Sequence, residues 1–323
     1  MNQTSKHHNS EQRMYWLHAT SPLHVGAGRG IGFIDLPIAR EKVTDWPYVP
    51  GSAVKGVLAD HRGVTDETRK NDDSLHKIAF GRADVNGESP NSGSLVFTDA
   101  RLICLPVRSL YGTFAWCTSP LALERLKRDF KDATPLAPPD IPTPVSGTLQ
   151  AHVTSDPRSV LVGDKQHVYL EDLDFDAVPC GNADSWAKTL AASIFGETAW
   201  QALFCERFAV VPDDVFTFLC QTGTQVDARV KIQEDSKTVA DGQLWYEESL
   251  PTETILAGIV WCGPVFGQNR RDGAVSKTDL LNAFAQEACD LQIGGKATVG
   301  RGRVRMSFGS LDDNPNAKPE VAS

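Results

Sequence analysis

The arrangement of apolar residues constrains the fold of this chain most, because strand-like and helix-like stretches follow one another without a regular repeat. The stretches with strand patterns are residues 14–20, 224–232, 255–261 and 303–308. Those with helical spacing are residues 52–60, 121–131, 186–206 and 278–289, with Ser52 and Thr278 as the expected N-caps. Since a regular βαβ alternation is missing, the sequence predicts an α+β fold built on an antiparallel sheet.

Residues 14–310 are expected to form a single domain with two insertions. Residues 62–94 are polar and charged, and residues 134–185 are rich in Pro, Asp and Gly with little periodicity, so the second insertion is expected to be long and irregular. The polar ends, residues 1–13 and 311–323, are expected to be disordered.

The overall charge argues against a protein that binds nucleic acid through a general positive field. The net charge is −9, so any such binding must come from local basic stretches. The seven cysteines are odd in number and contain no Cys-x-x-Cys pair, which argues against a disulfide scaffold or a zinc ribbon and favours the cytoplasm. The chain lacks a run of about 18 apolar residues, so we expect no membrane association.

A glycine-rich run, PLHVGAGRGIGFIDLPIARE (residues 22–41), is the most unusual motif. Its glycines fit neither the dinucleotide-binding fingerprint nor a Walker A loop. They suit a flexible hairpin turn, or a loop in which Gly28 and Gly30 let the backbone approach a polyanion closely. Asp35 is either the cap of a turn or a general base or cation ligand beside a phosphodiester, and His24 is either structural or catalytic.

Two further segments suit contact with phosphates. Lys55, in PGSAVKGVL (residues 50–58), is either a solvated surface charge or a phosphate ligand near a helix N-terminus. The second segment, LQIGGKATVGRGRV (residues 291–304), combines glycines with cations and predicts a loop that follows a nucleic-acid backbone. Its candidate RNA-binding residues are Gly294, Gly295, Lys296, Arg301 and Arg303.

The string GQLWYEE (residues 242–248) joins aromatic and acidic residues. Trp245 and Tyr246 suit stacking on a base, and Glu247 and Glu248 suit proton transfer or metal binding. The same residues also suit a plain strand edge. The scattered histidines predict no stable zinc site.

Taken together, these strings resemble one family. The runs at residues 22–41, 46–58, 105–129, 210–216, 244–248 and 291–304 resemble, in order and spacing, the RAMP-superfamily backbone subunits of type III-B CRISPR (Cmr) complexes. The resemblance covers roughly residues 14 to 308. It implies an RRM-like, ferredoxin-like palm, with helical fingers as an insertion and a β-hairpin thumb near residues 227–250.

The resemblance also implies partners and an activity. Copies of such a subunit stack as a filament along a guide crRNA with other subunits of the complex, and each thumb displaces a nucleotide of the guide–target duplex. Target RNA is cut beside each displaced nucleotide. In this chain Asp35 falls on the family's catalytic position, His24 and Glu247 fall on further active-site positions, and Lys55 falls on a guide-binding lysine. Ser249 departs from the family pattern, since relatives have Tyr there.

These roles predict a metal-dependent endoribonuclease. A divalent cation, Mg²⁺ or Mn²⁺, would be held by Asp35 together with RNA phosphates, water or groups such as Glu247, or Asp35 would itself accept the proton of a 2′-hydroxyl. The expected products carry 2′,3′-cyclic phosphate (or 3′-phosphate) and 5′-hydroxyl ends. Two alternatives stay open: a guide-binding scaffold without activity, and an endonuclease that processes guide precursors alone.

Overall fold

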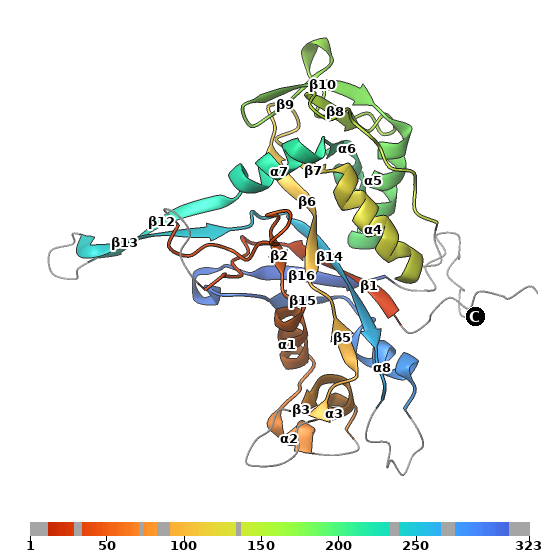
Figure 1. Cartoon of the computed structure of the whole chain (residues 1–323), viewed down its shortest axis with the longest axis vertical. Helices are drawn as coiled ribbons and strands as arrows, with labels where there is room; N and C mark the ends of the chain where they lie inside the picture. Colours follow the sequence, from red (N-terminus) through yellow and green to blue (C-terminus); the bar gives the residue numbers. More distant parts are fainter. Residues whose placement is uncertain are drawn as a thin grey trace, which may run out of the picture.

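The computed structural model describes residues 12–28, 34–70, 74–82, 91–133, 137–232, 239–265 and 275–309. Its centre is a sheet of twelve strands (Figure 1). Along the main path the strands are β15 (Cys289–Gln292), β16 (Arg303–Phe308), β1 (Gln12–Ala19), β14 (Ile255–Cys262), β6 (Ala100–Arg108), β7 (Phe114–Thr118), β11 (Phe208–Val210), β8 (Gln150–Val153), β10 (Leu173–Pro179) and β9 (His167–Leu170). The short strands β2 (Tyr48–Val49) and β5 (Leu95–Phe97) pair with β6 and β14.

The part β16-β1-β14-β6 of this sheet is antiparallel throughout. Helix α1 (Gly51–His61) lies between β1 and β6 in the sequence, and α8 (Lys277–Phe284) lies between β14 and β16. This is the β-α-β-β-α-β order of the ferredoxin-like fold, with the first and third core strands in the middle. The predicted α+β class and RRM-like palm are therefore confirmed.

Helices cover both faces of the palm sheet. Alternate residues of β1 enter separate cores, with Tyr15 and Leu17 in one and Met14 and Trp16 in the other. Apolar residues of α1 and α8 join the first core, and α4 (Pro120–Ala133), α5 (Gly181–Ile194) and α6 (Thr198–Glu206) supply the second. Because the sheet is covered on both faces, β1 is buried along nearly its whole length and β14 is a continuous apolar run. Among the described residues, no helix is long and apolar enough to cross a bilayer.

The thumb is a two-stranded hairpin, β12 (Gln225–Ile232) and β13 (Val239–Ser249), which projects away from the sheet (Figure 1). It follows α7 (Asp213–Thr222) and occupies the region expected for it. The apolar face predicted from the alternation in β12 is exposed, because Val226, Val230 and Ile232 retain 39%, 45% and 56% of their accessible surface. The hairpin thus presents an apolar face that the chain itself leaves uncovered.

Three predicted helices differ from the observed ones. In α1 the N-cap is Pro50 and not the expected Ser52, because the helix already begins at Gly51. The stretch 186–206 forms two helices, α5 and α6, because Phe195 takes an extended conformation and its ring packs on Phe204 in the second core. The predicted helix 278–289 begins at Lys277, and its cap is Ser276, whose hydroxyl accepts from the Asp279 N–H in a capping box. It ends at Phe284, and residues 289–292 form β15 instead.

The two insertions are more ordered than expected. Within residues 134–185 the chain forms β8, β9, β10 and the short helix η1 (Asp164–Gln166). Strand β8 joins the main sheet antiparallel to β11, and β10 pairs with β8 in parallel. The prediction of an irregular segment was therefore wrong, because strands as short as β8 and β9, with four residues each, give little periodicity. Within residues 62–94 the structure shows α2 (Asp66–Lys70), α3 (Leu75–Phe80), β3 (Gly81–Arg82) and β4 (Asn91–Ser92). The predicted disordered ends lie outside the described residues, apart from Gln12 and Arg13 in β1.

Candidate active site

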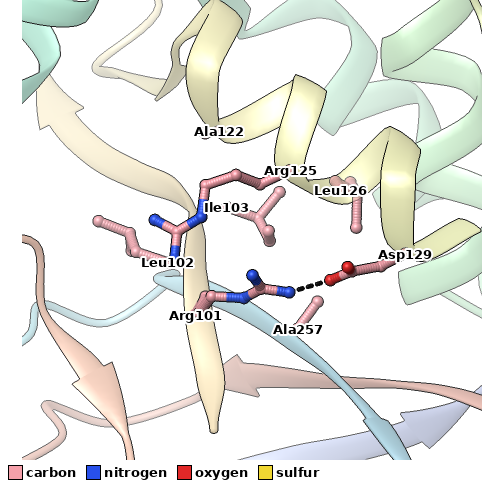
Figure 2. A pocket seen from close by; sticks show the side chains of 8 residues that line it. All are labelled: Arg101, Leu102, Ile103, Ala122, Arg125, Leu126, Asp129 and Ala257. Atoms are coloured by element: carbon pink, nitrogen blue, oxygen red, sulfur yellow. Dashed lines mark hydrogen bonds and ion pairs between the residues drawn. The ribbon is translucent and has the colours of Figure 1, made fainter. Parts of the chain in front are cut away.

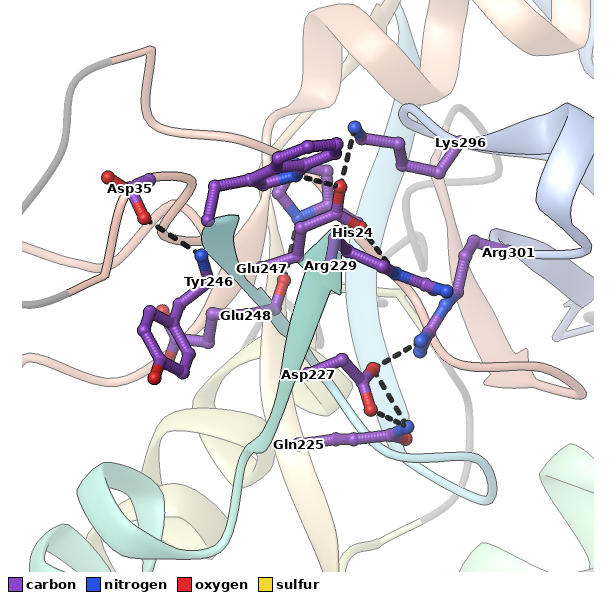
Figure 3. Close-up of polar contacts among 11 residues, drawn as sticks. His24, Asp35, Gln225, Asp227, Arg229, Tyr246, Glu247, Glu248, Lys296 and Arg301 are labelled. Carbon is purple, nitrogen blue, oxygen red and sulfur yellow. Dashed lines mark hydrogen bonds and ion pairs between the residues drawn. The ribbon is translucent and has the colours of Figure 1, made fainter. Parts of the chain in front are cut away.

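Asp35 lies at the base of the thumb, in a segment that runs beside β13 (Figure 3). Leu36 forms a parallel bridge with Glu247, its N–H donates to the Tyr246 carbonyl at 3.1 Å, and its carbonyl accepts from the Glu248 N–H at 3.0 Å. The Asp35 carboxylate accepts from the Tyr246 N–H at 2.8 Å through Oδ2. Asp35 is exposed. The structure thus holds a solvent-accessible carboxylate in a defined orientation at the junction of the glycine-rich segment and the thumb.

His24 is buried between the thumb and the C-terminal glycine loop, residues 293–302. Its Nδ1 lies 2.6 Å from the carbonyl oxygen of Glu248, and a carbonyl only accepts, so Nδ1 carries the proton. The carbonyl of His24 accepts from the Gly295 N–H at 2.9 Å. His24 and Asp35 therefore bind main-chain groups of β13 that are two residues apart. A catalytic role for His24 stays a prediction.

Glu247 is a buried carboxylate surrounded by donors (Figure 3). Its Oε1 accepts from Lys296 Nζ and from Trp245 Nε1, both at 2.7 Å, and its Oε2 accepts from Arg229 Nε at 3.4 Å. Burial alone would raise the pKa of Glu247, but the hydrogen bonds from Lys296 and Trp245 and the two positive charges outweigh it and lower the pKa. The arrangement brings three predicted site residues together, with Glu247 holding the indole of Trp245 and the ammonium of Lys296.

The C-terminal glycine loop needs glycine for steric reasons at two positions. Gly294 and Gly302 have φ of +81° and +83°, and a Cβ at either would lie 2.2 Å from a carbonyl oxygen, that of His24 or that of Ile293. Gly295 and Lys296 follow, and Lys296 is left-handed with φ 66°. The loop packs against His24 along its first part, which accounts for Gly294, whereas a Cβ at Gly295 would lie at an ordinary contact distance of 3.5 Å from His24 Cδ2.

The two arginines of this loop region have different surroundings. Arg301 is buried, it pairs with Asp227 at the base of the thumb, and its Nη1 has no hydrogen-bond partner among the described residues. Gln225 also donates to Asp227, at 3.1 Å and 3.2 Å. Arg303 is exposed at the start of β16. Of the two, Arg303 presents the more accessible charge for a phosphate.

Lys55 and the early glycines lie outside this cluster of contacts. Lys55 is on α1, its ammonium donates to the Leu95 carbonyl at 2.7 Å, and burial together with the nearby charge of Arg69 lowers its pKa. Gly28 has φ +82°, and a Cβ there would meet nothing within 4 Å, so the backbone conformation alone explains the glycine. Gly30 lies outside the described residues.

The sequence analysis missed two residues near the site, Arg40 and Asp227, and it named Glu248 only as a candidate for proton transfer or metal binding. Neighbouring residues of a strand point to opposite faces, so the pair Glu247–Glu248 had to be split between two surroundings. Glu248 accordingly contacts Arg40 at 2.6 Å, on the other side from Lys296. Ser249, the expected departure from the family pattern, is buried and pairs with Gln225.

The side chains at the site do not form a cation site by themselves. Within the described part of the chain, no group of three or more His, Cys, Asp or Glu side chains is close enough to hold a metal ion. Glu247 is occupied by Lys296 and Arg229, which leaves Asp35 as one exposed carboxylate. A single carboxylate does not supply the six oxygen ligands that Mg²⁺ prefers.

Comparison with known proteins identifies the family. The model of the RAMP superfamily matches residues 16–305. The CRISPR system Cmr endoribonuclease Cmr4 of Pyrococcus furiosus is 31% identical over 92% of this chain and 96% of its own length. The crystal structure of oligomeric Cmr4 from the same organism superposes with a TM-score of 0.66 at 24% identity, covering 92% of this chain and 97% of that one.

A chain in the cryo-EM structure of the type III-B Cmr-beta complex bound to cognate target RNA has the same fold. Its TM-score is 0.66 at 16% identity, and the match covers 92% of this chain and 96% of that chain. The family model and the Pyrococcus protein match the sequence of this chain over nearly its whole length. These matches therefore show membership of the family as well as a shared fold. The chain belongs to the RAMP superfamily and, within it, to the Cmr4 family.

Proposed function

We propose that this chain is a crRNA-binding backbone subunit of a type III-B effector complex and that it cleaves complementary target RNA at regular intervals with Asp35. The observation that carries the proposal is the exposed Asp35 carboxylate, which the Tyr246 N–H orients at the base of the thumb. The Pyrococcus relative is named an endoribonuclease, which supports RNA cleavage as the activity.

The chemistry proposed for Asp35 is proton abstraction. When the thumb displaces a target nucleotide, its 2′-hydroxyl can align with the adjacent phosphate. Asp35 takes the 2′-hydroxyl proton, the 2′-oxygen bonds to phosphorus, and the bond from phosphorus to the 5′-oxygen breaks. The 5′-oxygen leaves with a proton from solvent, which gives 2′,3′-cyclic phosphate and 5′-hydroxyl ends. The ammonium of Lys296, whose side chain is 33% exposed, is suited to stabilise the extra charge on the phosphate.

The thumb and the glycine loop are proposed to hold the RNA. The exposed apolar face of the thumb, including Val230 and Ile232, would lie against the guide–target duplex at the displaced nucleotide. Arg303 and the backbone of the C-terminal glycine loop would track phosphates. Copies of this chain and the other subunits of a Cmr complex are the proposed protein partners, in line with the oligomeric relative.

A divalent cation, Mg²⁺ or Mn²⁺, also forms part of the proposal. Because the described side chains do not form a cation site, phosphate oxygens of the bound RNA and water would have to supply most ligands, with Asp35 as the protein carboxylate. When bound, the cation would neutralise the charge that develops on the phosphate.

The test is cleavage by a reconstituted complex that carries Asp35→Ala or Asp35→Asn, with target binding measured in parallel. Cleavage is expected to fall by roughly 10²- to 10⁴-fold, the usual contribution of a general base, with binding unchanged. Asp45→Asn is the matched control, because Asp45 is exposed in a nearby turn with φ 60°, which Asn tolerates. Unchanged cleavage in both Asp35 variants would mean that the chain is a guide-binding scaffold and that another subunit cuts.

A further inference from the structure

Glu248 stands apart from the other carboxylates near the site, because it is buried and it contacts the segment that carries Asp35. Its Oε2 accepts from the Ile38 N–H at 3.0 Å, and its Oε1 accepts from Arg40 Nη2 at 2.6 Å (Figure 3 shows Glu248 beside Tyr246 and Asp35). Thr224, which lies between α7 and β12, donates to the same Oε1 at 2.9 Å. The side chain of Glu248 therefore joins the Asp35 segment, β13 and the connection from α7 to β12.

These contacts extend the short pairing between the Asp35 segment and β13. The backbone of β13 binds the segment at Asp35 and Leu36, and the next donors along the segment are bound by the side chain of Glu248. On its other side the segment pairs with residues 25–27, since Ala27 donates to Pro37 and Ala39 donates to Val25. Without the side chain of Glu248, the hydrogen bonds between the Asp35 segment and β13 would end at Leu36.

Arg40 connects the charge of Glu248 to the rest of the palm. Its Nη1 donates to the carbonyls of Asp45 at 2.8 Å and Cys220 at 3.0 Å, while its Nη2 binds Glu248. Both side chains of the ion pair are mostly buried, with 14% and 3% of their surface exposed. A buried carboxylate with a cation and two further donors holds its neighbours in one geometry.

We propose that Glu248 is a positioning residue for cleavage, which acts by fixing the backbone around Asp35 through Ile38 and Arg40. The inference rests on the proposed role of Asp35 and adds to it a residue that does not touch the RNA. The main chain of Glu248 also accepts from His24 Nδ1, so the same residue contacts both predicted catalytic segments.

The experiment compares Glu248→Gln with the wild type in the reconstituted complex. Single-turnover cleavage and target affinity are measured separately, and hydrogen–deuterium exchange is followed in peptides covering residues 34–40. Gln keeps the shape of the side chain but loses its charge for Arg40. We expect cleavage to slow roughly 10- to 100-fold, as misplacement of a catalytic group by about 1 Å does, with affinity unchanged and faster exchange in residues 34–40.

The matched control is Asp129→Asn. Asp129, on α4, is a buried carboxylate paired with Arg101 of β6 beside a small pocket (Figure 2), so it tests the general cost of breaking a buried ion pair. We expect it to leave the cleavage rate and the exchange of residues 34–40 unchanged.

Each outcome decides between the inference and its alternatives. Wild-type cleavage in Glu248→Gln, or an equal loss in Asp129→Asn, would overturn the positioning role while Asp35 keeps its own. Slow cleavage without faster exchange in residues 34–40 would also overturn it, because Glu248 would then act other than through this segment. If Asp35→Ala itself cleaves normally, both the proposed function and this role fail.

Discussion

Lys296 Nζ lies 2.7 Å from Glu247 Oε1, so an ion pair joins the C-terminal glycine loop to the thumb. A second pair, Arg301 with Asp227, joins the same two parts, and Asp227 lies opposite Glu247 in the hairpin. Within the thumb itself, Arg229 also contacts Glu247 at 3.4 Å. In the free chain the cations of the loop are thus occupied by carboxylates of the thumb, and these contacts set where the loop lies relative to Asp35.

Glu247→Gln should weaken this connection. The variant leaves Lys296 and Arg229 without their carboxylate, and the free energy of unfolding is expected to fall by about 1–3 kcal/mol, because one partner is buried and the cations are partly exposed. Urea denaturation of the isolated subunit measures the change. Glu253→Gln, which removes a carboxylate bound to His18 at 2.6 Å, is the control for losing a paired carboxylate elsewhere. An unchanged midpoint would contradict the importance of the Lys296 pair.

The same carboxylate predicts a dependence of stability on pH. The pKa of Glu247 is lowered below its ordinary value of 4.5, so the folded chain binds fewer protons than the unfolded chain near that value. The stabilisation is therefore fully present above pH 4.5 and is lost as the pH falls through the folded-state value. The difference in stability between wild type and Glu247→Gln should shrink on acidification from neutral pH. A constant difference down to the acid range would contradict the lowered pKa.

Gly294→Ala should disturb the site through the backbone. The substitution forces a side chain into a left-handed conformation, and its Cβ would lie 2.2 Å from the carbonyl oxygen of His24. Gly300→Ala is the matched control, since it has φ +79° but meets nothing within 4 Å. We expect a loss of roughly 1 kcal/mol for Gly300→Ala and clearly more for Gly294→Ala, with altered NMR signals of His24 only in the latter. An equal loss of stability in the two variants would show that the loop moves away from His24 without cost and relieves the clash.

Sequence patterns predicted the palm well because its elements are long and buried. The bounds of β16 were predicted to the residue, and those of α1 to within one residue, since the alternation in β16 and the apolar face of α1 leave few alternatives. The insertion at residues 134–185 was predicted poorly. Strands such as β8 and β9 have four residues each and owe their pairing to neighbours far along the chain.

Contacts at the candidate site between residues far apart in the sequence could not be predicted from local patterns. The family resemblance pointed to Asp35 and Glu247, and the pattern of glycines and cations pointed to Lys296. The ion pair between Glu247 and Lys296 joins residues 49 positions apart and follows from the fold. Glu248 and Arg40 are 208 positions apart, so no spacing rule relates them. By contrast, the opposite surroundings of Glu247 and Glu248 follow from strand geometry alone, once β13 is taken as a strand.

Arg303→Ala should reduce the salt dependence of guide binding. Arg303 is exposed on β16, and one lost phosphate contact lowers the slope of log K against log salt by about 0.7 for a single strand. Arg305→Ala is the matched control, because Arg305 is two residues further on the same strand and is paired with Asp290 at 3.1 Å. Binding of guide RNA at several salt concentrations measures both slopes. If the salt slope is smaller in Arg305→Ala than in Arg303→Ala, the phosphate contact is made by Arg305 and not by Arg303.

Removal of divalent cations should separate cleavage from folding. If RNA phosphates supply most ligands of the proposed Mg²⁺ or Mn²⁺ ion, chelation with EDTA should abolish target cleavage by the complex and leave the melting temperature of the isolated subunit unchanged. This expectation follows because the described residues offer no group of three metal-binding side chains, and a cation without a protein site gives no stabilisation by linkage. Cleavage that persists in EDTA would leave Asp35 as a general base acting alone. A rise in melting temperature with added Mg²⁺ would instead reveal a protein site, and Asp35→Asn should then remove that rise if Asp35 is one of its ligands.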